Sequence, residues 1–577
     1  MEFICDLEFV ICDFLYVMLK KWNVFSEDKE LQKKFADELN ISPITAQVLI
    51  NRNIVSLQQA HFFYKANLCD LHNPFLLRGM DIAVQRIKKA IAEREKIIVY
   101  GDYDADGITA TALLSSLLSK LGADVRCYIP NRLSEGYGLN KEALNKAASQ
   151  EVSLLITVDC GINAVEEVRY AAQLGIDIII TDHHRLGEEL PSAFAVINPL
   201  QTDCPYPDKN LAGVGLAYKL ASALTDEKGE EYLDLVALGT VADVVPLVGE
   251  NRVLVKEGLK KIGKGRIGLS ALAKVAGLKR EINAASIAYI LGPRINARGR
   301  LSSPQSALKL LLTSSWPEAE NLARVLNDEN ARRQKVEKEI LEQALKKLSD
   351  IDVEERKIII LSDERWHPGV IGIVASRLVE KYYRPVILIA IKERKAKGSG
   401  RSIKNFHLFD ALLQCKDILD ECGGHKYAVG LSLQVEKIEE FKQRMEEITD
   451  NLLSREDLIP CLNIDARLSL SQLDFKFLDE LTNLAPFGVG NPKPVFASKV
   501  RLKSFQRLKN NHLKIWVSDD KITYPALWFN QEGDFSPPAG EFQIAYSPTV
   551  NIWEGRKEIQ LVIKDVKSNL EFRDILG

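Results

Sequence analysis

The stretch that decides the fold is residues 96–114, KIIVYGDYDADGITATALL. Its apolar start predicts a buried β-strand, and the apolar run after Gly107 predicts a helix. Between them stand three carboxylates on alternate residues, Asp102, Asp104 and Asp106. Carboxylates two residues apart in an extended segment share one side of the backbone, and such a cluster of negative charge is costly unless a cation binds it. We therefore expect a metal site where this strand ends.

Further acids and imidazoles follow apolar runs downstream. Asp159 follows LLITV, and His183 and His184 follow IDIIITD. Continuous apolar strands that alternate with helices predict an α/β fold with a parallel sheet covered on both faces. Ligands bind outside the carboxyl ends of such strands, so we expect these side chains in one crevice. Asp243 stands in the apolar run LDLVALGTVADVVPL, where a lone carboxylate needs a partner.

The types of candidate ligand indicate which ion to expect. The Asp-rich loop lacks the downstream glutamate of an EF-hand, and imidazole suits manganese or zinc better than calcium or magnesium. With several carboxylates and one or two imidazoles, we expect Mn²⁺, with Mg²⁺ as the alternative. Two ions that share a carboxylate assist phosphoryl transfer, and enough ligands are present for two: Asp104, Asp106, Asp159, His183 and Asp243.

Length and composition set the class of protein. A chain of 577 residues predicts three or more domains, and a net charge of -3 neither indicates nor excludes a polyanion partner. Nine scattered cysteines without a C-x-x-C pair predict reduced thiols and a cytoplasmic location. Acids interrupt the apolar N-terminus, so we expect no membrane span and no signal peptide. Residues 1–17 are expected to be a non-native upstream extension before Met18.

Changes of pattern divide the rest of the chain. A mixed N-terminal segment, residues 18–75, is expected to be helical, and the strand–helix alternation then fills a domain at 76–312. A long helix with a polar middle is expected to connect domains at 313–350. A second α/β domain follows at 351–456, and short alternating strands at 457–577 predict an OB-like β-barrel.

Several motifs together resemble those of the DHH phosphoesterase superfamily. VYGDYDADG, ITVDCG, ITDHH and GTVADVVP look like its four metal motifs, and GGH looks like part of its DHH-associated substrate-binding domain. IPNRLSEGYGLN, LGPRINARGR, WHPGVIGIVASRL, KGSGRS and the terminal barrel are similar to its bacterial branch of single-strand-specific 5′→3′ exonucleases. The resemblance runs from Met18 to the end and implies a catalytic DHH domain at 76–312 and a DHH-associated domain at 351–456.

The resemblance implies a role for each residue of the metal motifs. It places the metal ligands at Asp104, Asp106, Asp159 (the bridging ligand), His183 and Asp243. His184 matches a second histidine, which in the superfamily lies against the scissile phosphate. Some members carry another histidine where this chain has Tyr100, so Asp102 or water is expected to fill that gap. The alternative for Asp102 is an ordinary helix cap.

Substrate contacts are implied in the same way. A guanidinium with hydroxyl and backbone donors suits a phosphate terminus, and the resemblance places a pocket for the terminal 5′ phosphate at Ser399, Arg401, Gly423, Gly424 and His425. Arg132 and Tyr137 are expected to contact the backbone and a base near the cleft, and Arg298 or Arg300 to reach a phosphate. The alternative for each arginine is a surface charge.

The predicted barrel carries a mixture of basic and aromatic residues. Phosphate neutralisation combined with base stacking is typical of single-strand binding, and the residues concerned are Lys499, Arg501, Lys503, Arg507, Lys509, Lys514, Phe505, His512 and Trp516. The alternative is a basic barrel whose aromatic side chains belong to its core.

Taken together, the resemblance implies a metal-dependent 5′→3′ exonuclease on single-stranded DNA that releases 5′-mononucleotides and acts in recombination and repair. The implied partners are single-stranded DNA with a free 5′ end and, as candidates, a single-strand-binding protein and a helicase. Two alternatives stay open. A small-substrate DHH enzyme, such as an oligoribonuclease or a cyclic-dinucleotide phosphodiesterase, does not need the connecting helix or the barrel. A catalytically silent strand-binding scaffold does not need the complete set of acids and histidines.

Overall fold

A computed structural model of the protein describes residues 20–131, 135–136, 138–227, 229–279, 281–301, 304–509, 511–529, 540–553 and 555–568, with the backbone only at 298, 300, 301, 553 and 568. Contacts divide the chain into two units. One, here called the catalytic unit because it contains the residues predicted to be catalytic, consists of Ile54–Ala331 and Asn483–Lys493. The other contains the residues up to Asn53, Arg332–Thr482 and the residues from Pro494 on. Among the described residues, no helix is long and apolar enough to cross a membrane. The expected extension at 1–17 lies outside the described residues.

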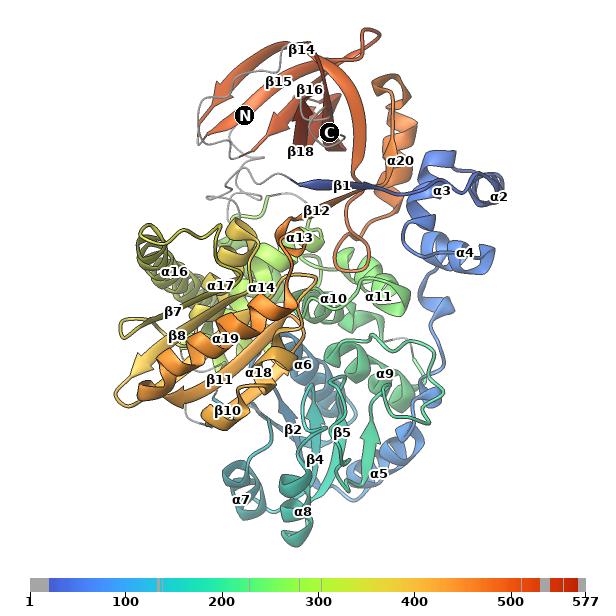
Figure 1. The fold of residues 1–577 in the computed structure, drawn as a ribbon. Helices are drawn as coiled ribbons and strands as arrows, with labels where there is room; N and C mark the ends of the chain where they lie inside the picture. Colours follow the sequence, from blue (N-terminus) through green and yellow to red (C-terminus); the bar gives the residue numbers. More distant parts are fainter. Residues whose placement is uncertain are drawn as a thin grey trace. The chain divides into compact units, whose positions relative to one another are not determined.

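A five-stranded parallel sheet forms the centre of the catalytic unit (Figure 1). Its strand order is β3-β2-β4-β5-β6, with β3 at Asp124–Tyr128, β2 at Lys96–Gly101, β4 at Val152–Val158, β5 at Asp177–Thr181 and β6 at Ala195–Ile197. Every pair of neighbouring strands is parallel. The parallel sheet predicted from the apolar runs is therefore confirmed.

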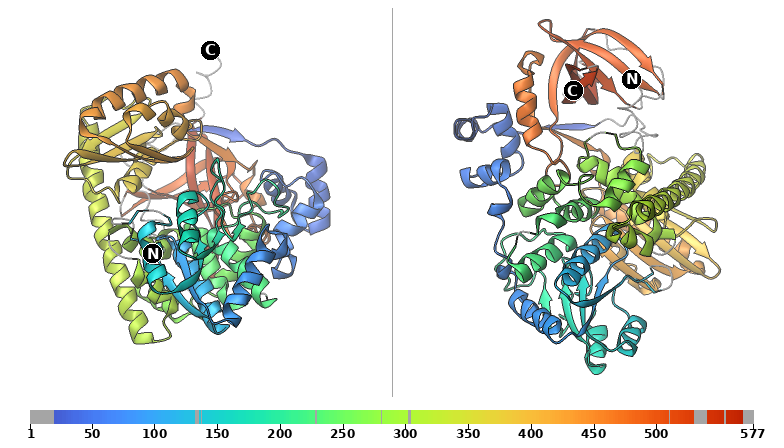
Figure 2. Two further views of the ribbon diagram at one scale, coloured as in Figure 1. Left: turned by 90° about the horizontal axis from the view of Figure 1, so that it is seen from below. Right: turned by 180° about the vertical axis from the view of Figure 1, so that it is seen from behind.

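Helices cover both faces of this sheet (Figures 1 and 2). Along β2, Ile97 and Val99 join the core on one face, whereas Ile98 and Tyr100 join the core on the other. The helices on the first face include α5 (Met80–Ala92), α6 (Ala105–Lys120) and α9 (Gly213–Thr225), and those on the second are α7 (Lys141–Ser149) and α8 (Val165–Gln173). Burial on both faces explains why β2 and β4 are apolar without alternation.

Further helices complete the catalytic unit. The helix α10 (Leu233–Ala242) packs among α6, α9 and α11 (Gly249–Leu259), which explains its almost wholly apolar sequence. The motif LGPRINARGR falls mainly on α14 (Gly292–Leu301), which continues from a π-helical turn at Ile287–Leu291. The remaining helices of the unit are α4 (Leu57–Lys65), α12 (Ile267–Val275), α13 (Ala284–Ser286) and α15 (Gln305–Leu312).

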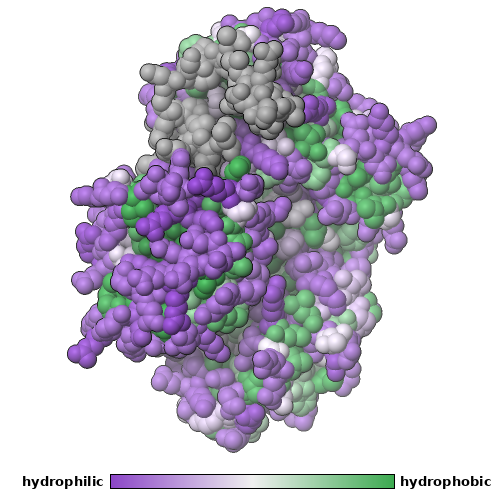
Figure 3. Space-filling view, viewed as in Figure 1, coloured by the Kyte–Doolittle hydropathy of each residue, from purple (hydrophilic) through white to green (hydrophobic). Residues whose placement is uncertain are grey.

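The predicted connecting helix is confirmed as α16, Trp316–Leu348, which runs from one unit into the other. Beyond it, a five-stranded mixed sheet has the order β10-β11-β9-β8-β7. Only β7 and β8 are parallel neighbours, and α17 (Ile371–Tyr382) connects them. Hydrophilic side chains dominate the outer face of this part over α19 (Ile438–Leu452) (Figure 3). The strands are β7 (Ile359–Asp363), β8 (Val386–Lys392), β9 (Lys395–Arg401), β10 (Glu421–His425) and β11 (Ala428–Gln434), and a short helix, α18, covers Leu408–Leu413.

The last part of the chain forms the predicted OB-like barrel. Its strands pair in the order β14-β15-β16-β18-β17, and β14 also pairs with β17, which closes the barrel. Their bounds are Phe496–Leu508 (β14), His512–Ser518 (β15), Thr523–Trp528 (β16), Glu541–Trp553 (β17) and Arg556–Ser568 (β18). The N-terminal segment contributes the helices α2 (Lys29–Leu39) and α3 (Pro43–Ile50), and also a strand, β1 (Lys21–Val24), which pairs with β12 (Cys461–Ile464). The helix α20 covers Phe475–Asn483, and β13 (Ala466–Arg467) pairs with β14.

Candidate metal centre

Four segments bring acids and imidazoles together in the catalytic unit. Three of them follow the neighbouring strands β2, β4 and β5 at the carboxyl edge of the sheet, and the fourth follows α10. Three groups of residues could each hold a metal ion, because within each group the possible ligand atoms lie within 4.8 Å of one another. The groups are Asp159, His183 and His184; Asp106, His183 and Asp243; and Asp102, Asp104 and Asp159. All six residues expected at the catalytic centre are therefore brought together, and Asp102 joins them.

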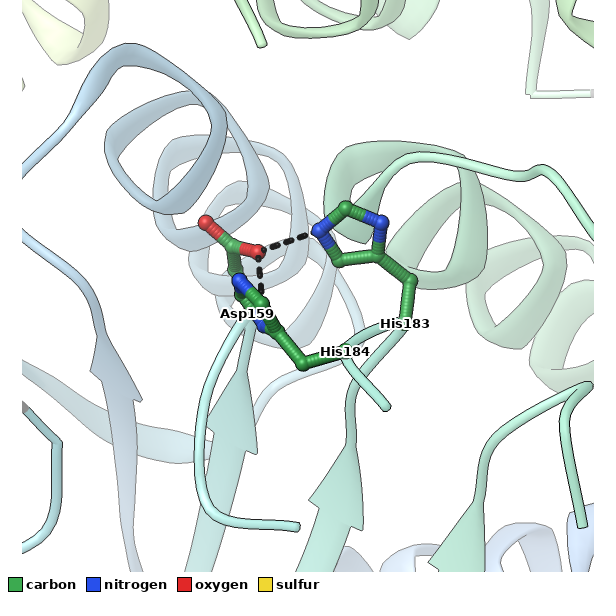
Figure 4. A group of neighbouring side chains, drawn as sticks. All are labelled: Asp159, His183 and His184. Carbon is green, nitrogen blue, oxygen red and sulfur yellow. Dashed lines mark ion pairs between the residues drawn. The ribbon is translucent and has the colours of Figure 1, made fainter. Parts of the chain in front are cut away.

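Asp159 and His183 lie at the centre of this cluster (Figure 4). The Nε2 atom of His183 lies 3.1 Å from Oδ1 of Asp159 and 3.6 Å from Oδ2 of Asp243. The Nδ1 atom of His184 lies 3.9 Å from the same oxygen of Asp159. Within the described part of the chain, Asp159 Oδ1 and His183 Nε2 are buried and make no hydrogen bond. Buried polar atoms rarely lack a partner, and carboxylate oxygen with imidazole nitrogen is a donor set that suits a divalent metal ion.

Burial and mutual repulsion raise the pKa values of the carboxyl groups. Burial, together with the charge of Asp104, raises the pKa of Asp106 to about 7. Burial and the neighbouring carboxylates likewise raise the pKa of Asp159 and of Asp243 well above the ordinary value. Burial and the charge of His184 lower the pKa of His183 to about 4, so its imidazole is neutral and offers a lone pair. A bound cation would favour the ionised carboxylates and so oppose the effect of burial.

The N-terminus of α9 holds Asp106. Oδ2 of Asp106 accepts a hydrogen bond of 2.7 Å from the N–H of Gly213, and Oδ1 of Asp106 accepts one of 2.8 Å from the N–H of Val214. The first N–H groups of a helix have no partner within the helix, and the helix dipole favours negative charge there. These bonds lower the pKa of Asp106 and partly oppose the effect of burial. Gly213 and Val214 could not be assigned from the sequence, because their contacts with Asp106 join segments more than 100 residues apart.

Two glycines leave room for the carboxylates. A Cβ on Gly213 would lie 2.6 Å from Cβ and 2.7 Å from Oδ1 of Asp159, and a Cβ on Gly239 of α10 would lie 2.9 Å from Oδ1 of Asp106. A side chain at either position would therefore displace a candidate ligand. Asp159 itself has a φ of 62°, in the left-handed region that aspartate adopts more readily than most residues.

Asp104 lies among the possible metal ligands, as expected, and also has a second role at the start of a helix. Asp104 is the N-cap of α6, because its Oδ1 accepts hydrogen bonds from the N–H groups of Asp106 and Gly107. The alternative that Asp102 caps the helix is therefore wrong, and Asp102 instead lies among the possible ligand atoms of Asp104 and Asp159. Tyr100 does not join the cluster, because its hydroxyl donates to the carbonyl of Gly138 in the core on the α7 and α8 face.

His184 is oriented by a buried aspartate. Asp182 Oδ1 accepts hydrogen bonds from Nδ1 and from the backbone N–H of His184, at 2.7 and 3.0 Å, and its Oδ2 accepts one from the N–H of Ile162. Burial lowers the pKa of His184, but the bond to Asp182 and the surrounding carboxylates outweigh burial and raise the pKa to about 9. A charged imidazole therefore lies beside Asp159, partly exposed to solvent.

The helix α14 packs against the loop that carries the first acids. Asn296 Oδ1 accepts a hydrogen bond of 2.7 Å from the N–H of Ala105, and a Cβ on Gly299 would lie 2.6 Å from the carbonyl oxygen of Tyr103. The backbone of α14 thus places residues 298 and 300, the two expected phosphate-binding arginines, on a helix next to this loop. The side chains of Arg298 and Arg300, and all of Arg132 and Tyr137, lie outside the described residues.

The residues expected to bind the terminal phosphate lie on neighbouring strands of the mixed sheet in the other unit. Ser399 of β9 and Gly423 of β10 are both paired with Gly430 of the intervening strand β11. Arg401 and His425 are likewise both paired with Ala428, so the residues of the two motifs lie in register across three strands. Arg401 donates a hydrogen bond of 3.2 Å to the hydroxyl of Ser399. A Cβ on Gly372, in the first turn of α17, would lie 2.8 Å from that hydroxyl, a close approach that the sequence analysis did not predict.

The barrel presents most of its expected binding residues to solvent. The side chain of Phe505 is 45% exposed, and Lys514 Nζ lies 5.0 Å from the ring centroid of Trp516. His512 is only 3% exposed and packs edge-on against Phe529. The prediction that His512 stacks on bases is therefore wrong, because its side chain is buried. The exposed basic residues of β14 and of the turn after it are Lys499, Arg501, Lys503, Arg507 and Lys509.

Three family models match the chain. The DHH family, N-terminal domain, matches residues 96–240, which include the six expected catalytic residues except Asp243. The DHHA1 domain matches 355–451 and the RecJ OB domain matches 464–565. The three matches fall on the parallel sheet, the mixed sheet and the barrel in that order.

Curated relatives and solved structures agree with these matches. The single-stranded-DNA-specific exonuclease RecJ of Bacillus subtilis is 40% identical over 569 residues, which cover 96% of this chain and 72% of the relative. The RecJ of Escherichia coli is 35% identical, with 93% of this chain and 99% of the relative covered. The crystal structure of RecJ in complex with Mn²⁺ from Thermus thermophilus matches with a TM-score of 0.84 and 33% identity, covering 95% of this chain and 79% of that one. The structure of the same protein with Mg²⁺ matches with a TM-score of 0.78 and 32% identity, covering 95% of this chain and 78% of that one.

The Gly213→Ala variant is expected to bind Mn²⁺ at least about 10-fold more weakly, as is typical when the support of a metal ligand is disturbed. The reason is that the added Cβ would collide with Asp159. Isothermal titration calorimetry of the metal-free protein measures the change. The matched control is Gly215→Ala in the same helix, where the nearest atom to an added Cβ would be Cδ2 of Leu211, at an ordinary contact distance of 3.4 Å. Unchanged Mn²⁺ affinity in a folded Gly213→Ala protein would contradict this arrangement.

Proposed function

The chain belongs to the RecJ family of single-stranded-DNA-specific exonucleases, and we propose that it is a metal-dependent 5′→3′ exonuclease that degrades single-stranded DNA to 5′-mononucleotides. The observation that carries this proposal is the buried cluster of acids around His183, in which two central polar atoms have no hydrogen bond among the described residues. We further propose that the protein acts in recombination and repair in the cytoplasm, on strands supplied by a helicase and bound by a single-strand-binding protein.

The metal centre is proposed to hold two divalent ions. The ligands are Asp104, Asp106, Asp159, His183 and Asp243, and Asp102 is added because of its position in the cluster. Such ions, when bound, activate water and neutralise charge on the scissile phosphate and the leaving oxygen. Mn²⁺ is the preferred ion and Mg²⁺ the alternative, and the donor set with its neutral imidazole supports this order.

The protein's own groups have distinct tasks around the scissile phosphate. The α9 N–H groups fix both oxygens of Asp106, so that this carboxylate keeps one orientation. Asp182 fixes the ring of His184 and keeps it charged, which provides a positive group beside Asp159 for the phosphate oxygens. Arg298 or Arg300, together with Arg132 and Tyr137, is proposed to bind the strand near this centre. The proposed role of Arg298 or Arg300 is supported by the packing of their helix, α14, on the loop of Tyr103 and Ala105.

The direction of digestion is proposed to come from the second unit. Arg401, Ser399 and His425, with the exposed backbone of Gly423 and Gly424, are proposed to bind the terminal 5′ phosphate. A group that recognises a strand terminus makes an enzyme act from that end. We also propose four successive parts of the chain: 76–312, 313–350, 351–456 and 457–577. The family-model matches at 96–240, 355–451 and 464–565 fall within the first, third and fourth of these parts.

Strands labelled at either end test the activity and its direction. With Mn²⁺ added, a 5′ label is expected to appear first, as a mononucleotide, because digestion starts at the captured 5′ end. Earlier release of a 3′ label would contradict the direction. Release of no label, with strand binding retained, would favour the silent scaffold, and cleavage restricted to the shortest oligonucleotides would favour a small-substrate enzyme.

The Asp159→Asn variant removes a proposed metal ligand. Loss of a residue behind a metal ligand typically lowers activity about 10- to 100-fold, and we expect a larger loss of nuclease activity in this variant because the ligand itself is changed.

Asparagine is chosen at position 159 because it tolerates the left-handed backbone of that residue. The matched control is Asp226→Asn, since Asp226 is exposed and also has a positive φ, of 58°. The control is expected to keep full activity. An Asp159→Asn protein as active as this control would contradict the assignment of the metal centre.

The Arg401→Met variant is expected to raise KM for 5′-phosphorylated strands while changing KM for 5′-hydroxyl strands little. The physical reason is that the guanidinium contributes to binding only when a terminal phosphate is present. Steady-state kinetics with the two kinds of strand measure the ratio. The matched control, Arg394→Met, removes an exposed arginine from the turn between β8 and β9. An equal rise in KM for both kinds of strand would contradict a phosphate pocket at Arg401.

The Trp516→Ala variant is expected to weaken binding of single-stranded DNA by about 1–3 kcal/mol, the usual value for one stacked base. Fluorescence anisotropy with a long labelled strand, without metal to prevent cleavage, measures the affinity. Lys521→Ala, in the turn before β16, is an exposed control outside the proposed platform. An affinity equal to that of the control would show that Trp516 serves only the barrel core.

A further inference from the structure

One segment packs with the catalytic unit although its neighbours in sequence belong to the other unit. This segment, Asn483–Lys493, is here called the strap. The side chain of Asn491 is fully buried and donates hydrogen bonds of 2.8 Å to the carbonyls of Leu484 and Pro486. Gly488 and Asn491 also exchange two backbone hydrogen bonds, of 2.9 and 3.1 Å. The strap is therefore a closed loop with a conformation of its own.

Arg252 of α11 fastens the beginning of the strap. Its guanidinium donates hydrogen bonds of 2.7 Å to the carbonyl of Leu484 and 3.0 Å to that of Asn483. The same group donates to the carbonyl of Phe63 and lies 4.0 Å from the centroid of the Phe63 ring. Arg252 is only 2% exposed, so these bonds are shielded from water.

The tip of the strap lies against residues 246–248. The N–H of Leu247 donates a hydrogen bond of 2.7 Å to the carbonyl of Val489. A Cβ on Gly488 would lie 2.7 Å from Cδ1 of Leu247, and a Cβ on Gly490 would lie 3.1 Å from Cγ1 of Val248. The two surfaces therefore meet so closely that side chains at 488 and 490 do not fit without displacement.

The residues that the strap holds come directly after Asp243. Asp243 ends α10, and its N–H donates to the carbonyl of Gly239 at 2.9 Å. Val244 has a φ of 64° and is 63% exposed. A β-branched residue in the left-handed region is an outlier that costs about 1–3 kcal/mol and persists only where its surroundings fix it. The backbone around Val244 is held by the helix α10 before it and by the buried Leu247 after it.

Asp243 also differs from the other candidate ligands in its support. The loops with Asp102 to Asp106, Asp159, and His183 all follow hydrogen-bonded strands of the sheet. Asp243 follows a helix end instead, and its Oδ2 lies 3.6 Å from Nε2 of His183. Its backbone is held by the last hydrogen bonds of α10 on one side and continues into the strained turn at Val244 on the other.

We propose that the strap is a positioning element of the metal centre: by holding Leu247 it keeps Val244 in the left-handed conformation and Asp243 beside His183. This inference rests on the proposed metal centre. It adds residues that do not bind the metal but hold a ligand in place. Because the strap lies in sequence between α20 and the first long barrel strand, β14, ligand geometry becomes linked to the segment that leads into the barrel.

The Gly488→Val variant tests this role by pushing Leu247 away from the strap. We expect Mn²⁺ binding to weaken about 10- to 100-fold, the range found when a group behind a metal ligand is disturbed. Electron paramagnetic resonance of free Mn²⁺, titrated into the metal-free full-length protein without DNA, measures the affinity independently of nuclease activity. The matched control is Gly265→Val, since Gly265 is exposed and an added Cβ there would meet nothing within 4 Å.

Asn491→Ala is a second, milder variant, which loosens the strap from within and applies if Gly488→Val does not fold. A conformational role also predicts a rescue: Val244→Asn, combined with Asn491→Ala, should recover part of the lost Mn²⁺ affinity, because asparagine adopts the left-handed region more readily than valine. A strap that only stabilises the fold would give no such recovery.

The outcomes separate this inference from the proposed function. Wild-type Mn²⁺ binding in a folded Gly488→Val or Asn491→Ala protein would overturn the role of the strap and leave the metal centre intact. A wild-type protein that binds no Mn²⁺ would contradict the metal centre itself, and the role of the strap with it. Weaker binding in both variants, with rescue by Val244→Asn, is the result that supports the proposal.

Discussion

The catalytic unit depends on the close approach of Asp106 and Asp159, two carboxylates buried at the edge of a parallel sheet. Burial raises the pKa of both groups; the charge of Asp104 adds to the effect on Asp106, and the charge of Asp106 adds to the effect on Asp159. The arrangement is therefore costly unless positive charge is supplied. The helix dipole of α9 supplies part of it through two N–H groups on Asp106, and a divalent cation supplies the rest. Other features near this pair follow from the same need. Gly213 and Gly239 leave the space, Asp159 adopts a left-handed backbone, and His183 stays neutral.

Much of the fold and of the site could be predicted because the signals are local. Apolar runs without alternation predicted the parallel sheet, and acids directly after those runs predicted where Asp104, Asp106, Asp159 and His183 meet. The barrel strands followed from their spacing. The roles of Asp102 and Asp104 could not be separated in this way, because both are compatible with a cap or a ligand until the start of α6 is known. Burial of His512 could not be predicted from the strand pattern either, because Phe529, which packs against it, lies beyond the next strand.

The supports of the site were not predictable from one sequence, because they join distant segments. Gly213 meets Asp106 across more than 100 residues, Asn296 meets Ala105 across 191, and Arg252 meets Leu484 across 232. The supporting residues Gly213, Asn296 and Arg252 carry no carboxylate, imidazole or thiol that would mark a metal ligand. The four ligand-bearing segments also differ in their place in the fold: three follow strands of one sheet, whereas Asp243 ends the helix α10 and precedes Val244, which has a positive φ.

The most direct test of the central claim, a two-ion centre at the edge of this sheet, is anomalous X-ray diffraction at the manganese edge from crystals soaked in Mn²⁺. The account predicts two anomalous peaks about 3.5–4 Å apart, with Asp159 next to both and His183 next to one. A single peak, or peaks only outside the cluster that contains Asp102, Asp106 and Asp243, would contradict it.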